Sequence, residues 1–196
     1  EIAETRNGAP ADGVRRVSCI DKSNVTRGCQ LFRSTFDEVA ADYPGTEADY
    51  GYIDAFMQWI TRSPEHYDTV VTSNMFGDIS TDLGAVLQGG MGMAASGNIG
   101  DEHAFFEPVH GSAPKHAGQN KVNPIASINS IQMMMDYLGR KNNDDDLVAV
   151  GRLIDESVAD HLKEGKMLTY DIGGTASCSD VGISIANRLA AKLKER

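Results

Sequence analysis

The amino-acid sequence predicts an α/β fold, because short β-branched or apolar runs alternate with longer segments of helical periodicity. Residues 14–20 and 69–72 have the composition of buried strands. Apolar side chains recur at helical spacing in 31–41 and 52–60, and a further helix is expected at 78–87, after the second strand. Alternation of strands and helices on this scale is typical of an α/β domain.

Local residue choices predict where these elements begin and end. The first strand is expected to end where Asp21 and Lys22 turn the chain, and Pro44 stops the first helix. Residues 74–77 read as a turn, which would place Asp78 at the N-terminus of the next helix. Negative charge is favoured at that end of a helix.

Three further helices are predicted in the second half of the chain, at 124–138, 147–162 and 181–193. Pro124 suits the first turn of a helix, and Gly139 is expected near the end of the same helix. The glycine-rich passage 89–97 is expected to be a close-packed crossing between two lobes.

Composition bounds the class of protein. With 196 residues, the chain is long enough for one substantial domain or two small ones. The hydrophobic content of 41% and charged content of 23% are ordinary for a globular protein. The net charge of −10 argues against nucleic acid as a partner, since binding phosphates needs clustered Lys and Arg. Cys19, Cys29 and Cys178 lack metal-like spacing and favour a reducing, cytoplasmic setting.

Targeting features are not evident in the sequence. No apolar run approaches the ~20 residues that span a bilayer, so no membrane partner is expected. The polar start at Glu1 carries no basic-then-apolar leader and reads as the middle of a larger protein.

Three smaller expectations concern individual side chains: 144–146 as an exposed acidic turn, 133–135 as helix core, and His66, His103 and His161 as surface residues.

Two carboxylates, Asp78 and Asp82, are four residues apart in a weakly charged stretch. On a helix this spacing puts both side chains on one face, and carboxylate oxygens are ligands that Mg²⁺ or Mn²⁺ prefers. The same spacing also fits a helix cap followed by a solvated surface residue. The pair therefore predicts a metal site only in combination with other residues.

The loop from His110 to Gly118 is the second segment whose residues suggest ligand binding. Gly111 and the small residues Ser112 and Ala113 would let backbone N–H groups face phosphate or ribose. No G-x-G-x-x-G follows a strand, so the loop is not a Rossmann fingerprint. Composition alone fits a Gly/Pro surface loop equally well.

Four strings in the sequence carry a resemblance to a known family: Asp21-Lys22-Ser23-Asn24, residues 74–82, residues 107–118, and Asn123-Pro124. Together they resemble the β-decarboxylating 2-hydroxyacid dehydrogenases, which include 3-isopropylmalate, isocitrate, homoisocitrate, D-malate and tartrate dehydrogenases. The resemblance runs from about Val17 to Arg188 and covers only the C-terminal part of a family subunit.

The resemblance implies a particular architecture. The expected fold is the isopropylmalate/isocitrate dehydrogenase-like two-lobed subunit, with only the later portion of each lobe present. Residues 1–88 would belong to the smaller, dimer-forming substrate and metal lobe, and 89–196 to the larger nucleotide-binding lobe.

The resemblance also assigns roles to residues of the first half. Asp78 and Asp82 would bind the catalytic Mg²⁺ or Mn²⁺ together with Asp54 of the neighbouring subunit, in a homodimer with shared active sites. Lys22 would be the catalytic lysine, also acting across the dimer interface, where it can take the proton of the substrate hydroxyl. Asn24 would lie near substrate and nicotinamide.

In the second half, the resemblance implies that the loop wraps the adenosine half of the cofactor. Lys115 and Tyr170 favour NADP over NAD, because many NAD-using relatives carry an acidic residue at the first position and NADP-using isocitrate enzymes carry a matching tyrosine. Gly174, in place of an expected arginine, weighs against NADP, and so does His116, in place of a common tyrosine. The cofactor-binding residues implied are Glu107, His110, Gly111, Ser112, Ala113, Pro114, Lys115, His116, Val122, Asn123 and Tyr170.

The implied activity is metal-dependent oxidation and decarboxylation of a small 2-hydroxy acid bearing a β-carboxylate, with hydride transfer to NAD(P). 3-Isopropylmalate is the favoured substrate, although residues 171–174 look more like NAD-linked isocitrate subunits. The family's tyrosine acid and its substrate-binding arginines lie upstream of the part that the resemblance covers. Two other classes stay open: a non-catalytic nucleotide-binding or regulatory fragment, and a metal-dependent hydrolase that uses the aspartates.

Overall fold

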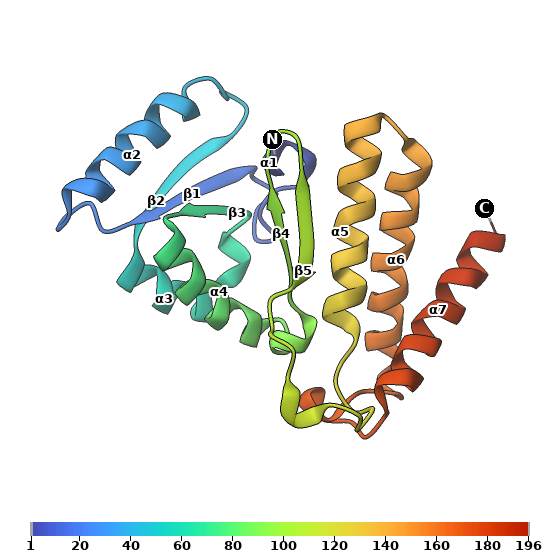
Figure 1. Cartoon of the computed structure of the whole chain (residues 1–196). Coiled ribbons are helices and arrows are strands. Elements are labelled where there is room, and N and C mark those ends of the chain that lie inside the picture. Colours follow the sequence, from blue (N-terminus) through green and yellow to red (C-terminus); the bar gives the residue numbers. More distant parts are fainter. Residues whose placement is uncertain (1, 196) are drawn as a thin grey trace. The chain divides into compact units, whose positions relative to one another are not determined.

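The computed structural model describes residues 2–195, which divide into two compact units between Leu87 and Gln88 (Figure 1). Each unit has its own sheet and its own helices. One residue after the boundary follow Gly89 and Gly90, whose φ angles of 111° are accessible mainly to glycine. No helix among the described residues is both long and apolar enough to cross a membrane.

A three-stranded parallel sheet organises the first unit, in the order β2-β1-β3. The central strand β1 (Arg16–Asp21) pairs with β2 (Glu47–Tyr52) on one side and with β3 (Thr69–Thr72) on the other. Parallel strands end at a common edge of the sheet, and the register pairs Asp21 with Tyr52 there. This edge positions the first group of candidate site residues.

Helices follow each strand of the first unit. The predicted helices are present as α2 (Arg27–Ala40), α3 (Ile53–Arg62) and α4 (Asn74–Leu87), with the short α1 (Ile2–Thr5) and η1 (Pro64–His66) in addition. The sequence did not predict β2, because its residues are largely polar and exposed at the edge of the sheet.

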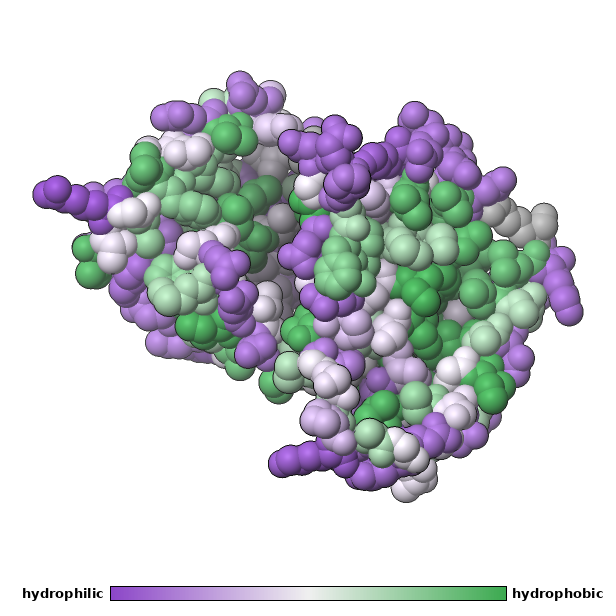
Figure 2. Space-filling view, viewed as in Figure 1, coloured by the Kyte–Doolittle hydropathy of each residue, from purple (hydrophilic) through white to green (hydrophobic). Residues whose placement is uncertain are grey.

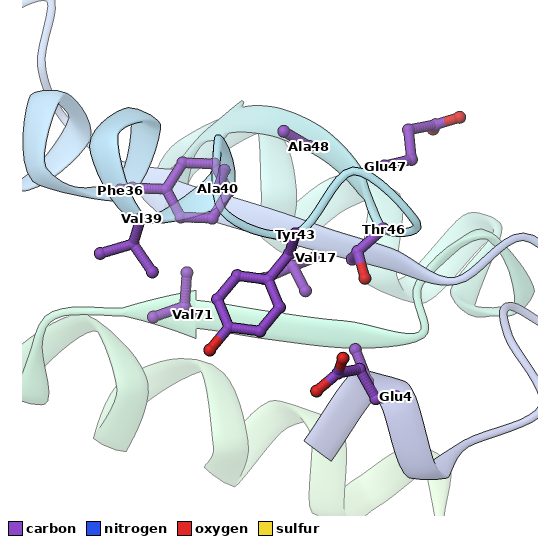
Figure 3. A pocket seen from close by; sticks show the side chains of 11 residues that line it. Glu4, Val17, Phe36, Val39, Ala40, Tyr43, Thr46, Glu47, Ala48 and Val71 are labelled. Carbon is purple, nitrogen blue, oxygen red and sulfur yellow. The ribbon is translucent and has the colours of Figure 1, made fainter. Parts of the chain in front are cut away.

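An apolar cavity of about 240 Å³ lies between α2 and the sheet (Figure 3). Phe36 and Val39 of α2 line it together with Val17 of β1 and Val71 of β3. No residue of α2 is fully buried. Apolar packing therefore holds this helix only partly, and polar contacts with the sheet contribute to its position.

The second unit combines an antiparallel pair of strands with three long helices. The strands are β4 (Ala95–Ile99) and β5 (Ala104–Pro108), and the helices are α5 (Ile125–Asn142), α6 (Asp145–Glu164) and α7 (Cys178–Lys194). Single turns of 3-10 helix occur at η2 (Met91–Met93), η3 (Pro114–His116) and η4 (Tyr170–Ile172). The core is formed by Met93, Ile125, Val158, Val181 and Ile185.

Two sequence-based expectations in this unit are confirmed only in part. The acidic run 144–146 is exposed as predicted, but it is not a turn, because α6 begins at Asp145 and Asp144 caps it by accepting the N–H groups of Asp146 (3.0 Å) and Leu147 (3.1 Å). The helix α5 continues to Asn142, so the predicted end at residue 138 is too early, but Gly139 lies near the end as predicted. It is buried inside the helix, where a Cβ would come within 2.7 Å of Val148, so glycine permits the close approach of α5 and α6.

The prediction that His161 is a surface residue is also wrong. Its side chain is 2% exposed, and Nδ1 lies 3.0 Å from Oγ of Ser184 on α7. Its Nε2 atom has no hydrogen-bond partner among the described residues. The spacing to Ile154 and Val158, at i−7 and i−3, identifies the buried face of α6 and could have revealed this. His66 is half-buried, with Arg16 donating to its carbonyl at 2.7 Å, whereas His103 is exposed as expected.

Protonation of His161 is expected to destabilise the protein at acidic pH. Burial lowers the pKa of this imidazole below its ordinary value of 6.5, so the unfolded chain binds the proton more tightly. The free energy of unfolding is then highest above pH 6.5 and falls as the pH drops through this value, by at most about 1.4 kcal/mol per pH unit. Urea midpoints across a pH series measure the slope. His161→Gln should reduce the slope and the exposed control His103→Gln should keep it; an undiminished slope in His161→Gln would contradict the assignment.

Candidate active site

Lys22 lies in the turn between β1 and α2. The backbone of this turn is fixed because the N–H groups of Val25 and Thr26 donate to the Lys22 carbonyl, at 2.9 and 3.0 Å. The Lys22 ammonium forms an ion pair with Asp54, in the first turn of α3. The hydrogen bond from Lys22 lowers the pKa of the Asp54 carboxyl. Asn24, in the same turn, is exposed.

Asp78 and Asp82 lie on α4, but not as the sequence suggested. The helix begins at Asn74, so Asp78 is in its second turn and the prediction that it stands at the helix N-terminus is wrong. The residues read as a turn are helical: the Gly77 N–H donates to the Ser73 carbonyl at 2.8 Å. The i, i+4 spacing still places both carboxylates on one face, and both are exposed.

These two side chains are suitable ligands for a hard divalent cation. Asp78 accepts a hydrogen bond of 3.1 Å from Asn74, and the Asp82 carboxylate has no side-chain partner within the described part of the chain. Residues 2–195 contain no cluster of three or more metal-ligating side chains. The first unit by itself therefore offers two carboxylates on a helix face, and a full oxygen shell would need substrate, water or another subunit.

The nucleotide-loop candidates belong to the second unit, where Glu107 lies on β5 and is exposed. Ala113 adopts a left-handed conformation with φ of 46°, which is uncommon for a residue with a side chain. The backbone N–H groups of Gly111, Ser112 and Ala113 have no hydrogen-bond partner within residues 2–195. Three consecutive free N–H groups can serve phosphate or ribose oxygens. His110 turns its Nδ1 to the Gly111 carbonyl, at 2.8 Å.

Asn123 is placed differently from its neighbours in the loop. Its side chain is 6% exposed and works inside the unit, accepting the Ile125 N–H at 3.0 Å and donating to Asp171 at 3.1 Å. The first bond lies at the start of α5, and the second connects Asn123 to η4. Because the side chain is engaged in these bonds, the predicted nucleotide contact would be made by the backbone of Asn123. Val122, the residue before it, is half-buried.

Tyr170 and His116 lie together, although 54 residues separate them. The tyrosine hydroxyl is 3.5 Å from Nε2 of His116, and the two rings lie 5.9 Å apart. Lys121, which belongs to none of the motifs in the sequence, places its ammonium 5.3 Å from the centre of the Tyr170 ring. Lys115 precedes His116 on η3 and is exposed. The structure therefore adds a second lysine to this cluster.

Gly174 stands where an arginine is expected, and the backbone around it leaves no room for a side chain. A Cβ at this position would lie 1.9 Å from the carbonyl oxygen of Leu168, far inside contact distance. The backbone closes here because the Gly174 N–H donates to the Thr169 carbonyl at 2.9 Å. No side chain fits this position without a backbone shift, so Lys121 is the available replacement for a positive charge near Tyr170.

Comparisons with known proteins agree with the motifs. Residues 2–185 match the family model described as isocitrate/isopropylmalate dehydrogenase. The homoisocitrate dehydrogenase of Methanocaldococcus jannaschii is 45% identical over 92% of this chain and 50% of its own length. The 3-isopropylmalate dehydrogenase of Thermobifida fusca is 42% identical over 89% of this chain and 48% of its own. The chain thus spans about half the length of the curated relatives it matches.

Solved structures show the same likeness. The β-decarboxylating dehydrogenase of Thermococcus kodakarensis superposes with a TM-score of 0.81 at 39% identity, over 91% of this chain and 50% of that one. The isocitrate dehydrogenase of Methylococcus capsulatus gives a TM-score of 0.80 at 33% identity, over 89% of this chain and 50% of that one. The predicted α/β, isopropylmalate/isocitrate dehydrogenase-like fold, present in part, is confirmed.

Proposed function

The chain belongs to the isocitrate/isopropylmalate dehydrogenase family, and from this we propose that it carries the metal- and nucleotide-binding residues of an NAD(P)-dependent decarboxylating oxidoreductase. Its substrate would be a 2-hydroxy acid with a β-carboxylate, 3-isopropylmalate foremost. The observation that carries the proposal is the ion pair between Lys22 and Asp54, 32 residues apart. It joins the residue proposed for proton transfer to one proposed for metal binding.

The side chains of the first unit suit the steps of such a reaction. A bound Mg²⁺ or Mn²⁺, held by Asp78 and Asp82 together with Asp54 of a second copy, would supply Lewis acidity. Lys22, in its neutral amine form, would accept the hydroxyl proton of the substrate, and NAD(P) would supply the hydride acceptor. Its contact with Asp54 keeps the Lys22 side chain beside one of the proposed metal ligands. Asn24, exposed in the same turn, is available to the substrate and the nicotinamide.

A homodimer with a shared active site is the assembly we propose. Apolar side chains reach the surface of both units, and they appear green in Figure 2. On α4, the exposed Met75, Ile79 and Val86 have helical spacing with Asp78 and Asp82, so one face combines apolar side chains with the metal candidates. Exposed apolar patches of this kind mark protein interfaces, and a second copy would bring its own Asp54 to this face.

A panel of 2-hydroxy acids tests the activity. The protein, in the longest form that its gene encodes, is assayed with Mn²⁺ on 3-isopropylmalate, isocitrate, homoisocitrate, D-malate and tartrate. We expect turnover of 3-isopropylmalate. Turnover of another of these acids would change the substrate and keep the reaction class. No turnover of any acid with either cofactor would leave a nucleotide-binding or regulatory role in its place. The free cysteines suit a reducing compartment such as the cytoplasm.

NADP is the cofactor that we favour over NAD. Lys115, Lys121, His116 and the Tyr170 hydroxyl offer an additional phosphate several hydrogen-bond donors. In the panel, NADP should give the higher kcat/KM, and Lys115→Glu should lower kcat/KM with NADP by about tenfold or more through like-charge repulsion. Lys141→Glu, on α5, is the matched control and should leave the ratio between the cofactors unchanged. A wild-type preference for NAD would contradict this assignment.

A further inference from the structure

Asp21 is a buried carboxylate directly before Lys22. Its side chain is 1% exposed, and a charge in such a place needs partners that replace water. Arg33 of α2 provides two hydrogen bonds, from Nε at 2.7 Å and from Nη2 at 3.0 Å, and the Ser23 N–H provides a third at 2.8 Å. Burial raises the pKa of this carboxyl, yet these hydrogen bonds outweigh it and keep the pKa below its ordinary value.

Arg33 is itself held between two aromatic rings of β2. Its guanidinium lies 5.2 Å from the ring centre of Tyr50 and 5.4 Å from that of Tyr52. The Tyr50 hydroxyl donates to Asp37 of α2 at 2.7 Å, which fixes this ring relative to α2. The Arg33 guanidinium thus connects α2 with β1 through its hydrogen bonds to Asp21, and with β2 through the two tyrosine rings.

The same contacts reach the Lys22 side chain. Its ammonium lies 5.8 Å from the ring centre of Tyr52, which also contacts Arg33, and its ion-pair partner Asp54 follows Tyr52 by two residues. The peptide groups on both sides of Lys22 are fixed as well. Asp21 holds the N–H of Ser23, and the Lys22 carbonyl accepts two N–H groups of the turn.

We propose that Arg33 is a positioning residue for Lys22: by holding Asp21 at the end of β1, it fixes the turn from which Lys22 extends to Asp54. A lysine on an unfixed turn would sample many orientations, and proton transfer needs the nitrogen within hydrogen-bond reach of the substrate. The inference rests on the function proposed for Lys22. The geometry of the turn can nevertheless be tested without turnover.

Hydrogen exchange of the turn amides tests the geometry directly. Arg33→Lys keeps the charge but loses the two-pronged contact with Asp21 and the stacking on the rings. We expect the Ser23, Val25 and Thr26 amides to exchange about tenfold faster, the factor expected from losing one charged hydrogen bond. Arg62→Lys is the matched control, because Arg62 stacks on Trp59 at 5.4 Å in the same unit. It should leave these amides unchanged.

Two outcomes would overturn the proposal. One is a folded Arg33→Lys variant whose turn amides exchange at the wild-type rate. If that variant exchanges faster throughout β1 and β3, it has lost its fold, and Tyr50→Leu takes its place, because it removes one of the two rings that hold the Arg33 guanidinium and so loosens its contact with Asp21 while keeping both charges. An unchanged turn in folded Tyr50→Leu is the second overturning outcome, whereas faster exchange confined to the turn supports the proposal.

Kinetics separate positioning from simple stabilisation. In the active protein, Arg33→Lys should lower kcat by about tenfold with KM changed less than about twofold, since substrate contacts are retained. A residue with a structural role alone would lower the amount of folded enzyme and leave kcat per active site unchanged, which would contradict positioning. If Lys22→Met keeps full turnover, Lys22 is not the base of the proposed reaction. The exchange data would still decide whether Arg33 fixes the turn.

Discussion

Replacing Lys22 by methionine is expected to lower kcat by about 10²–10⁴-fold, the range that loss of a general base produces. Methionine preserves much of the length and the apolar stem of lysine but cannot accept a proton. The Lys22 ammonium pairs with Asp54 and lies in a turn fixed by backbone hydrogen bonds. The KM for substrate should change little, because no binding role is assigned to this nitrogen.

Steady-state kinetics at saturating substrate and cofactor measure this effect. Lys194→Met, at the exposed end of α7, is the matched control and should retain the wild-type kcat. A reduction of kcat smaller than about threefold in Lys22→Met would assign the base to another residue. Circular dichroism of both variants confirms that the comparison is between folded proteins.

Replacing Asp82 by asparagine is expected to weaken Mn²⁺ binding by about 10²-fold, the upper end of the loss caused by altering even an outer contact of a metal site. The amide keeps the size of the carboxylate and one oxygen, but it removes the negative charge that a divalent cation needs. Asp82 has no side-chain partner within the described residues, so no internal hydrogen bond is lost with the charge.

Titration with Mn²⁺, followed by electron paramagnetic resonance of the free ion, measures the affinity. Asp42→Asn, in the exposed segment after α2, removes the same charge away from α4 and is expected to bind Mn²⁺ like the wild type. Equal affinity in Asp82→Asn and Asp42→Asn would remove α4 from the metal site. Weakening in both variants by the same factor would indicate non-specific attraction to an acidic protein.

The sequence predicted elements that bury apolar side chains and failed where polar residues form regular structure. β1 carries Val17, Cys19 and Ile20, and β3 is β-branched throughout, so their patterns are sufficient. β2 is polar and lies at a sheet edge, so only its pairing with β1 identifies it as a strand. The predicted start of α4 at Asp78 is too late because Gly77 suggests a turn, whereas Gly77 is helical and its N–H makes an ordinary backbone hydrogen bond to Ser73.

The candidate site could be predicted only as a set of separate motifs. The sequence identified Lys22 and Asp54 by resemblance, but their ion pair depends on how β1 and β2 align in the sheet. The side chain of Asn123 is occupied by Ile125 and Asp171, a tertiary arrangement that no local pattern encodes. Asp21 offered a usable signal, since a carboxylate at the end of an apolar strand requires a cationic partner.

The stoichiometry of carbon dioxide release tests the proposed reaction most directly. The protein is incubated with the preferred acid and NADP, and reduced cofactor and CO₂ are measured with Mn²⁺ present and after chelation. We expect equal amounts of the two products, both abolished by the chelator and both restored when Mn²⁺ is added back. Cofactor reduction without CO₂, or equal rates with and without the metal, would contradict a metal-dependent decarboxylating dehydrogenase.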